Sequence, residues 1–196
     1  NSQTYQEAAR HFGVSKSQIA RHAWHYQIGG HSDEVDLDLS LVHDPDFWRL
    51  IGWWVAEGSV AEVGNHRRTK QVCFAVHRME VNEVSGLIEK VCKKAPRIKM
   101  GLGNDAALFI NSTQLYEYCL AFGRGATHKF LPEWFLHIDP ELQREWLKGY
   151  WAGDGSWSRN TGYRLSTASP SLAANLQRLL ARLEVAAYIY SDHKAG

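Results

Sequence analysis

The chain has 196 residues, of which 44% are hydrophobic and 22% charged, and both values are ordinary for a globular domain. Its formal net charge is only +1, no apolar run approaches the ~20 residues that a membrane span requires, and no signal-peptide pattern is present. Three scattered cysteines form neither a disulfide framework nor a zinc pattern. These features argue against a membrane protein and a disulfide-rich secreted domain, and they favour a reducing, cytoplasmic location.

Residues 4–27 resemble a helix-turn-helix. A helix with an apolar face is followed by Gly13, which ends it, and by Ser15, which can cap a second helix. The exposed early part of that second helix would carry Gln18 and Arg21, which are side-chain types able to reach bases or phosphates. We therefore expect a small all-α DNA-binding module, with an ordinary helical hairpin as the alternative.

Charge is unevenly distributed along the chain. Residues 1–46 hold three basic and seven acidic residues, for a net charge of −4, whereas the rest of the chain carries +5. A basic body joined through an acidic connector favours nucleic-acid binding more than the overall charge does. We expect the first module at residues 1–28, an acidic linker at residues 29–43 and the main body from residue 44 onward.

Two stretches in the main body share one pattern. Residues 50–58 (LIGWWVAEG) and residues 147–155 (LKGYWAGDG) both read leucine, one residue, glycine, three mostly apolar residues, a small residue, an acid and glycine. An Asp-Pro pair precedes each, beginning at Asp44 and Asp139, and this pair is typical of an N-cap followed by proline at the first helical position. Each stretch is predicted to be a helix that ends near its last glycine and carries an acid on its final turn.

Small residues four positions apart predict how these two helices pack. They are Gly52 and Ala56 in the first helix and Gly149 and Gly153 in the second. Because nothing larger than a methyl group intervenes, the two faces can pack backbone to backbone. In a parallel arrangement Glu57 and Asp154 would meet at one end. Two carboxylates in close proximity are costly unless a positive group lies between them, and a divalent cation with oxygen ligands is the usual solution.

Alternation and apolar periodicity predict the elements around the motifs. Alternation in the strand at 70–78 places Val72 and Phe74 on one face and Cys73, Ala75 and His77 on the other. The order of strand and helix recurs after the second motif, which implies a duplicated, pseudo-twofold α+β domain. Its second half lacks a counterpart of residues 106–135. The expected elements are a hairpin at 59–78, a helix at 81–94, a hairpin at 97–111, a helix at 112–122, a basic loop at 123–132, a strand at 163–169, a helix at 172–183 and a strand from 188.

The two motifs, each followed by strand and helix, resemble the LAGLIDADG homing endonucleases of the monomeric, two-motif type, over roughly residues 44–190. The resemblance implies a saddle of two α-β-β-α-β-β-α halves, at residues 44–137 and 138–196, with the second half incomplete. It also implies that Glu57 and Asp154 bind Mg²⁺ or Mn²⁺. Backbone carbonyls near Ala56 and Gly153 would assist them.

The same resemblance assigns two further residues to the reaction. Lys129, in a Lys-x-x-Pro setting, matches the lysine that the family carries in the loop before the second motif. Arg78, at the end of its strand, matches a polar position that organises water in the active site. The implied activity is Mg²⁺-dependent hydrolysis of double-stranded DNA at a long asymmetric target, often from within an intein. The expected DNA-binding residues are Gln18, Arg21, Arg67, Arg68, Lys70, His77, Arg159 and Arg164.

Two other classes of function remain as alternatives. The first is a LAGLIDADG protein that binds DNA, or assists RNA splicing like a maturase, without cleaving. The second is an unrelated helix-turn-helix regulator with a ligand domain, in which Glu57 and Asp154 would merely lie at helix ends. Paired carboxylates also suggest a glycosidase, but no pattern of a sugar-binding cleft accompanies them.

Overall fold

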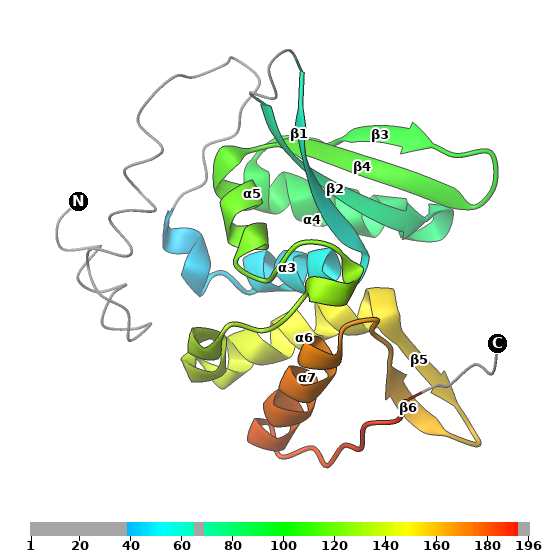
Figure 1. The fold of residues 1–196 in the computed structure, drawn as a ribbon. Helices are drawn as coiled ribbons and strands as arrows, with labels where there is room; N and C mark the ends of the chain where they lie inside the picture. Colours follow the sequence, from blue (N-terminus) through cyan, green and yellow to red (C-terminus); the bar gives the residue numbers. More distant parts are fainter. Residues whose placement is uncertain (1–38, 65–68, 192–196) are drawn as a thin grey trace, which may run out of the picture.

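The computed structural model describes residues 39–64 and 69–191, and the expected helix-turn-helix, most of the acidic linker, Arg67 and Arg68 lie outside these residues. The described chain is a mixed α+β fold, as predicted (Figure 1). Its helices and strands are α3 (Pro45–Glu57), β1 (Gly58–Val63), β2 (Thr69–His77), α4 (Val81–Cys92), β3 (Arg97–Met100), β4 (Asp105–Asn111), α5 (Thr113–Leu120), α6 (Pro140–Asp154), β5 (Gly155–Ser158), β6 (Gly162–Leu165) and α7 (Pro170–Arg182). Short 3-10 helices occupy Leu39–His43, Arg78–Glu80, Ala126–His128 and Glu133–His137.

Helices α3 and α6 form the centre of the molecule, with the four-stranded sheet on one side of the pair and β5–β6 on the other (Figure 1). Both helices begin as the sequence predicts. The Asp44 carboxylate accepts the backbone N–H of Asp46 at 2.8 Å, and Asp139 accepts that of Glu141 at the same distance. Gly58 and Gly155 stand at the two C-caps. The predicted bounds of both motif helices are therefore confirmed.

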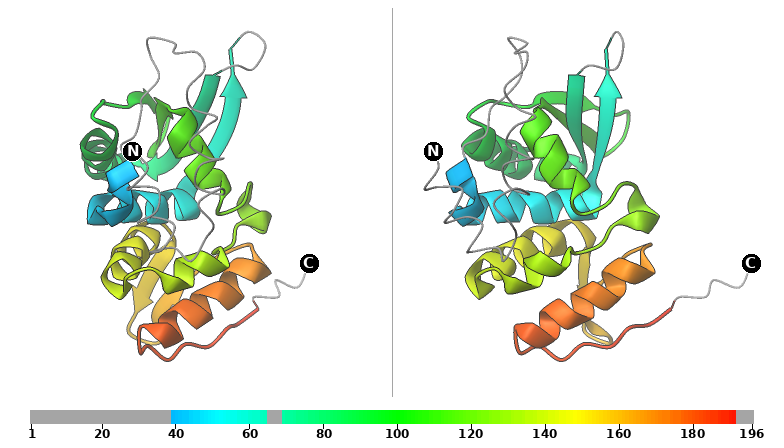
Figure 2. Two further views of the ribbon diagram at one scale, coloured as in Figure 1. Left: turned by 90° about the vertical axis from the view of Figure 1, so that its left-hand side faces the viewer. Right: turned by 60° about the vertical axis from the view of Figure 1, so that its left-hand side comes forward.

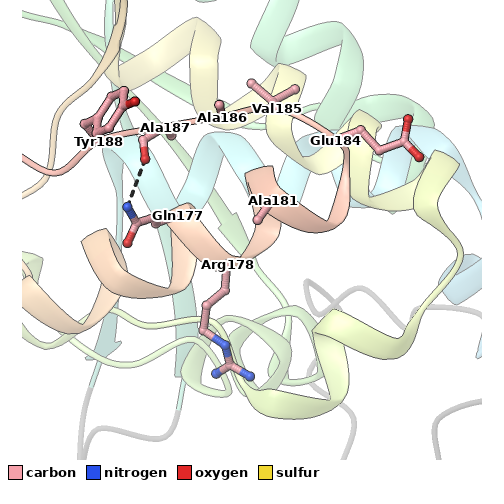
Figure 3. A pocket seen from close by; sticks show the side chains of 8 residues that line it. All are labelled: Gln177, Arg178, Ala181, Glu184, Val185, Ala186, Ala187 and Tyr188. Carbon is pink, nitrogen blue, oxygen red and sulfur yellow. Dashed lines mark hydrogen bonds between the residues drawn. The ribbon is translucent and has the colours of Figure 1, made fainter.

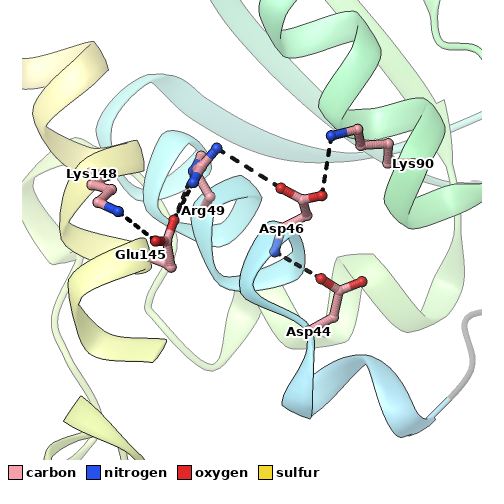
Figure 4. Close-up of polar contacts among 6 residues, drawn as sticks. All are labelled: Asp44, Asp46, Arg49, Lys90, Glu145 and Lys148. Atoms are coloured by element: carbon pink, nitrogen blue, oxygen red, sulfur yellow. Dashed lines mark hydrogen bonds and ion pairs between the residues drawn. The ribbon is translucent and has the colours of Figure 1, made fainter. Parts of the chain in front are cut away.

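Ion pairs join the N-terminal parts of these helices (Figure 4). The Arg49 guanidinium of α3 pairs with Glu145 of α6, which also pairs with Lys148 one turn further on. Asp46 accepts from Lys90 of α4 at 3.3 Å. These pairs fix α3 between α4 and α6 at the end opposite to the motif acids.

The first half contains an antiparallel sheet with strand order β1-β2-β4-β3. Val72, Phe74 and Val76 of β2 are buried beneath the helices, as the alternation predicts. Val84, Ile88 and Val91 supply the buried stripe of α4. The opposite face of the sheet carries no helix among the described residues.

After α6, the second half contains only the β5–β6 hairpin and α7 among the described residues. Both views in Figure 2 show α7 beside α6 on the side away from the four-stranded sheet. The strand predicted from residue 188 is wrong, because residues 188–191 join no ladder. In the first half β4 pairs with both β2 and β3, and no described strand takes the corresponding place beside β6. No helix of the described residues is long and apolar enough to span a membrane.

Candidate active site

Glycine lets the backbones of α3 and α6 touch. A Cβ built on Gly52 would lie 2.0 Å from the carbonyl oxygen of Trp146, and one built on Gly153 would lie 2.6 Å from the Cβ of Ala56. Real Cβ atoms do not approach other atoms so closely, so both positions require glycine at this separation. Gly52 of α3 meets Trp146 of α6, and Ala56, one turn further along α3, meets Gly153, which is further along α6. The two helices therefore run parallel. The predicted backbone-to-backbone packing is therefore present.

Glu57 and Asp154 consequently lie at the same end of the pair. Burial raises the pKa of the Glu57 carboxyl, and the charges of Asp154 and Glu80 raise it further, whereas Lys129 lowers it. Burial likewise raises the pKa of Asp154, against smaller opposing effects of Tyr150 and Lys129. Neither carboxylate forms a salt bridge with another described residue. The site thus brings two carboxyl groups together with Lys129 as a nearby cation, and burial still holds the pKa of each carboxyl above its ordinary value.

The ammonium group of Lys129 is directed at the end of α3. Its side chain is only 4% exposed, and Nζ donates to the carbonyl oxygens of Trp54 (3.0 Å), Val55 (2.7 Å) and Gly58 (2.9 Å). Burial lowers its pKa to about 8, although the carboxylates of Asp154 and Glu57 act in the opposite direction. Its three N–H donors therefore hold carbonyl groups at the C-terminal end of α3, where the Trp54 carbonyl also accepts the backbone N–H of Gly58. Sequence reasoning placed Lys129 near the acids but did not foresee these contacts.

Arg78 and His77 lie at the end of β2 and are both exposed. The His77 ring nitrogen Nδ1 accepts the backbone N–H of Met79, and the His77 N–H donates to Glu80. Among residues 78–80, Glu80 is the one whose charge acts on Glu57. The predicted role of Arg78 stays a prediction, and Glu80 is an acidic neighbour that the sequence analysis missed.

Lys70 differs from the other expected DNA-binding residues in its surroundings. It shares the helix-covered face of β2 with Val72, forms an ion pair with Glu62 of β1, and lies over the Tyr116 ring at 4.8 Å. Arg159 and Arg164 are exposed at the β5–β6 hairpin, as expected. Gln18, Arg21, Arg67 and Arg68 are outside the described residues.

The uncovered face of the four-stranded sheet carries two basic residues that the sequence analysis did not select. Arg97 pairs in register with Phe109 and lies over its ring at 4.9 Å, and Lys99 pairs with Ala107. Both partners alternate with the buried Leu108, so they face away from the helices. Extending the alternation from β2 to residues 97–100 would have placed these cations on this face.

An open pocket lies between α7 and residues 184–188 (Figure 3). Gln177 crosses it and donates to the carbonyl oxygen of Ala187 at 2.9 Å. Neither motif acid nor Lys129 lines this pocket. The arrangement of α3 and α6, rather than a deep cavity, therefore defines the candidate site.

The donor atoms at the two helix ends suit a hard divalent cation. They are the carboxylate oxygens of Glu57 and Asp154, which are hard ligands of the kind that such a cation prefers. No group of three or more His, Cys, Asp or Glu side chains with metal-binding geometry occurs in the described ranges. A cation at this site would therefore take its other ligands from water or substrate.

Comparisons with known proteins bear on the fold and on the C-terminal part of the chain. The family model described as a LAGLIDADG-like domain matches residues 141–196, and the described chain has the fold of the two-motif LAGLIDADG homing endonucleases. Similar structures include I-DmoI in complex with DNA and Ca, with a TM-score of 0.61 and 17% identity, covering 76% of this chain and 78% of that chain. I-DmoI in complex with DNA and Mn gives a TM-score of 0.61 and 18% identity, covering 78% and 85%.

Curated relatives share parts of this sequence. Uncharacterized protein MJ1054 of Methanocaldococcus jannaschii is 30% identical over 172 residues, covering 81% of this chain and 19% of the relative. The ATP-dependent DNA helicase Hel308 of Thermococcus kodakarensis is 27% identical over 188 residues, covering 87% and 16%. The ATP-dependent Clp protease proteolytic subunit of Chlamydomonas moewusii is 21% identical over 138 residues, covering 68% and 14%. The chain thus spans less than a fifth of the length of each of these relatives.

Proposed function

We propose that the chain is a site-specific endonuclease of the homing type, which hydrolyses both strands of double-stranded DNA with a divalent metal. The observation that carries the proposal is the meeting of Glu57 and Asp154 at one end of a parallel, glycine-packed helix pair. One polypeptide supplies both acids, which supports a monomer as the active species. The family match and the shared fold support a nuclease in general.

Each residue of the site has a distinct part in the proposed reaction. Glu57 and Asp154 would hold Mg²⁺ or Mn²⁺, with the carbonyls near Ala56 and Gly153 assisting. When bound, the cation supplies a Lewis acid that lowers the pKa of water and stabilises the leaving oxygen. Lys129 holds the end of α3 in place and contributes positive charge close to both carboxylates. Arg78, exposed beside this end, would orient water.

The DNA would lie along the uncovered face of the sheet. Arg97 and Lys99 provide cations there, and His77 marks the end of β2 nearest the acids. Arg159 and Arg164 would extend the contact from the second half. The basic turn with Arg67 and Arg68, and the first module with Gln18 and Arg21, would add contacts outside the described part. Most of these would bind phosphates and position the duplex.

The curated relatives support a mobile element as the context. Their printed names describe a helicase, a protease subunit and an uncharacterised protein, which share no stated activity. Each matches this chain over a small part of its own length. A segment that recurs in proteins of unrelated activity is typical of an insertion such as an intein. We therefore propose that the chain is the endonuclease part of an intein.

A cleavage-inactive protein that binds DNA or assists RNA splicing is the second candidate. The retention of Glu57, Asp154 and Lys129 in one arrangement favours cleavage over this alternative. Cleavage is tested with supercoiled plasmids that carry uninterrupted host-gene sequences, with and without Mg²⁺. The wild-type chain should linearise one plasmid only with Mg²⁺, and Asp154→Asn should bind that plasmid without cutting it.

Asp139→Asn is the matched control for this experiment. It makes the same chemical change at the other end of α6, where asparagine caps a helix as well as aspartate does. The control should cleave like the wild type. Binding without cleavage by all three proteins would favour the cleavage-inactive candidate. Cleavage that survives Asp154→Asn would place the active site elsewhere.

A further inference from the structure

The second half of the molecule holds the backbone of the loop at residues 123–132, which carries Lys129. The Ser169 hydroxyl donates to the carbonyl oxygen of Lys129 at 2.7 Å and accepts the backbone N–H of Leu172 at 3.2 Å. Ser169 is 1% exposed, so this hydroxyl is a buried group with both hydrogen-bonding functions used. It therefore caps α7 and fixes Lys129 at the same time.

A second contact from α7 supports the same loop. The Asn175 side-chain oxygen accepts the backbone N–H of Leu131 at 3.0 Å, two residues after Lys129. On the other side, the N–H of Phe130 donates to the carbonyl oxygen of Phe122. The segment before Lys129 is exposed, so these hydrogen bonds hold the loop where it enters the core.

The loop in turn holds the end of α3. Because the Lys129 ammonium donates to the carbonyls of Val55 and Gly58, a shift of its backbone would move the groups on both sides of Glu57. A continuous series of hydrogen bonds thus runs from Ser169 through Lys129 to the segment that carries Glu57. Each contact in the series is buried or partly buried.

We propose that Ser169 is a positioning residue for DNA cleavage, whose hydroxyl sets the place of Lys129 and of the Glu57 end of α3 from the second half. This inference rests on the proposed endonuclease function. The Ser169 hydroxyl bonds to the backbones of Lys129 and Leu172 and not to either motif carboxylate, so it acts through Lys129. Only serine or threonine provides a hydroxyl that can cap α7 and donate to Lys129 together.

Ser112→Ala is a matched control for Ser169→Ala. Ser112 is also fully buried, and its hydroxyl caps α5 by accepting the N–H of Leu115 at the same distance of 3.2 Å. Both variants lose a cap of the same kind, so both should unfold at a lower temperature. Only Ser169→Ala also removes the hydrogen bond to the carbonyl oxygen of Lys129.

Cleavage of the plasmid site is measured under single-turnover conditions with saturating Mg²⁺, together with the Kd for DNA. In Ser169→Ala the cleavage rate should fall about 10-fold or more at unchanged Kd, because small displacements of catalytic groups are costly. Ser112→Ala should cleave at the wild-type rate, and Ser169→Thr should restore it. Equal rates in the two alanine variants would overturn the inference.

Lysine acetylation followed by mass spectrometry tests the positioning without depending on cleavage. Lys129 should be protected in the wild type and in Ser112→Ala, and should react faster in Ser169→Ala and in Asn175→Ala. If Ser169→Ala does not fold, Asn175→Ala provides the test of how the loop positions Lys129. A wild-type chain that never cleaves would contradict the proposed function alone, whereas unchanged protection of Lys129 in both α7 variants would overturn the role of Ser169.

Discussion

A Cβ built on Gly149 of α6 would lie 2.0 Å from the carbonyl oxygen of Arg49 on α3. The reverse contact, from Gly52 to Trp146, has the same distance. Each helix therefore places a glycine against the backbone of the other helix, and that backbone fills the space that a side chain would need. This separation is what brings the carboxylates at the helix ends together.

Gly149→Ala should destabilise the fold strongly, because the new methyl group meets backbone atoms that cannot rotate away. We expect a loss of about 3 kcal/mol in the free energy of unfolding, at the upper end of the usual overpacking cost. Gly86→Ala is the control, since Gly86 lies within α4 and a Cβ there would meet nothing within 4 Å. That variant should gain about 0.5–1 kcal/mol from helix propensity alone. Urea unfolding measures both, and equal values would show that the helices are further apart.

The sequence predicted this helix pair because its signals are local. An Asp-Pro cap and small residues at four-residue spacing depend only on neighbours within one helix. The burial of Val72 and Phe74 was predictable for the same reason, since alternation is a property of a single strand. The helix-turn-helix interpretation of residues 4–27 lies outside the described residues and stays a prediction.

The contacts of Lys129 could not be predicted in this way. Its three acceptors precede it by 71 to 75 residues. They are backbone carbonyls, which every residue type has, so the sequence does not mark them as acceptors. The surroundings of Lys70 were within reach, because alternation places it with Val72 on the covered face. The strand expected from residue 188 failed since a strand depends on a partner, and the propensity of residues 188–190 cannot provide one.

Divalent metal should stabilise the protein through the motif acids. A ligand that binds only the folded state raises its stability by mass action. We expect the melting temperature to rise with Mg²⁺ in the wild type and in Asp139→Asn, and to stay constant in Asp154→Asn. Differential scanning fluorimetry with Mg²⁺ titrated against EDTA measures this effect. A Mg²⁺-dependent rise that persists in Asp154→Asn would argue against the assigned ligands.

In the metal-free protein, Glu57 and Asp154 should reduce the free energy of unfolding as the pH rises through the acid range. The pKa values of Glu57 and Asp154 are raised in the folded state above their ordinary values of 4.5 and 3.8. The folded state therefore binds these protons more tightly than the unfolded state, and its advantage is lost as the pH rises through the raised values. Urea unfolding in EDTA at several pH values should show a smaller loss in the double variant Glu57→Gln, Asp154→Asn. An equal loss would assign the effect to other groups.

Arg97 and Lys99 should contribute to DNA binding, and Lys70 should not. Removal of either exposed cation releases one phosphate contact, so each alanine variant should lower the slope of log Kd against log salt by about 1. Lys70→Ala should leave the slope nearly unchanged, since Glu62 already neutralises this ammonium on the covered face. Fluorescence anisotropy at several salt concentrations measures all three. A slope reduced by Lys70→Ala as much as by Arg97→Ala would show that DNA contacts the other face.

Two buried tryptophans should respond differently to replacement by phenylalanine. The Trp48 indole N–H donates to the carbonyl oxygen of Val42 at 2.8 Å, whereas that of Trp146 has no partner among the described residues. Both side chains are almost fully buried, so the loss of volume is the same. Trp48→Phe also leaves a carbonyl without its donor, whereas Trp146→Phe removes a donor that is already unsatisfied.

Trp48→Phe should therefore cost about 1 kcal/mol more in the free energy of unfolding than Trp146→Phe, which is the usual effect of one buried hydrogen bond. Phenylalanine retains the ring at both sites, including the stacking of residue 146 on Tyr150, where the centroids are 5.2 Å apart. Urea unfolding of the two variants under one set of conditions gives the difference directly. A costlier Trp146→Phe would contradict the expectation, and a bound water beside the Trp146 N–H would then be the group to seek.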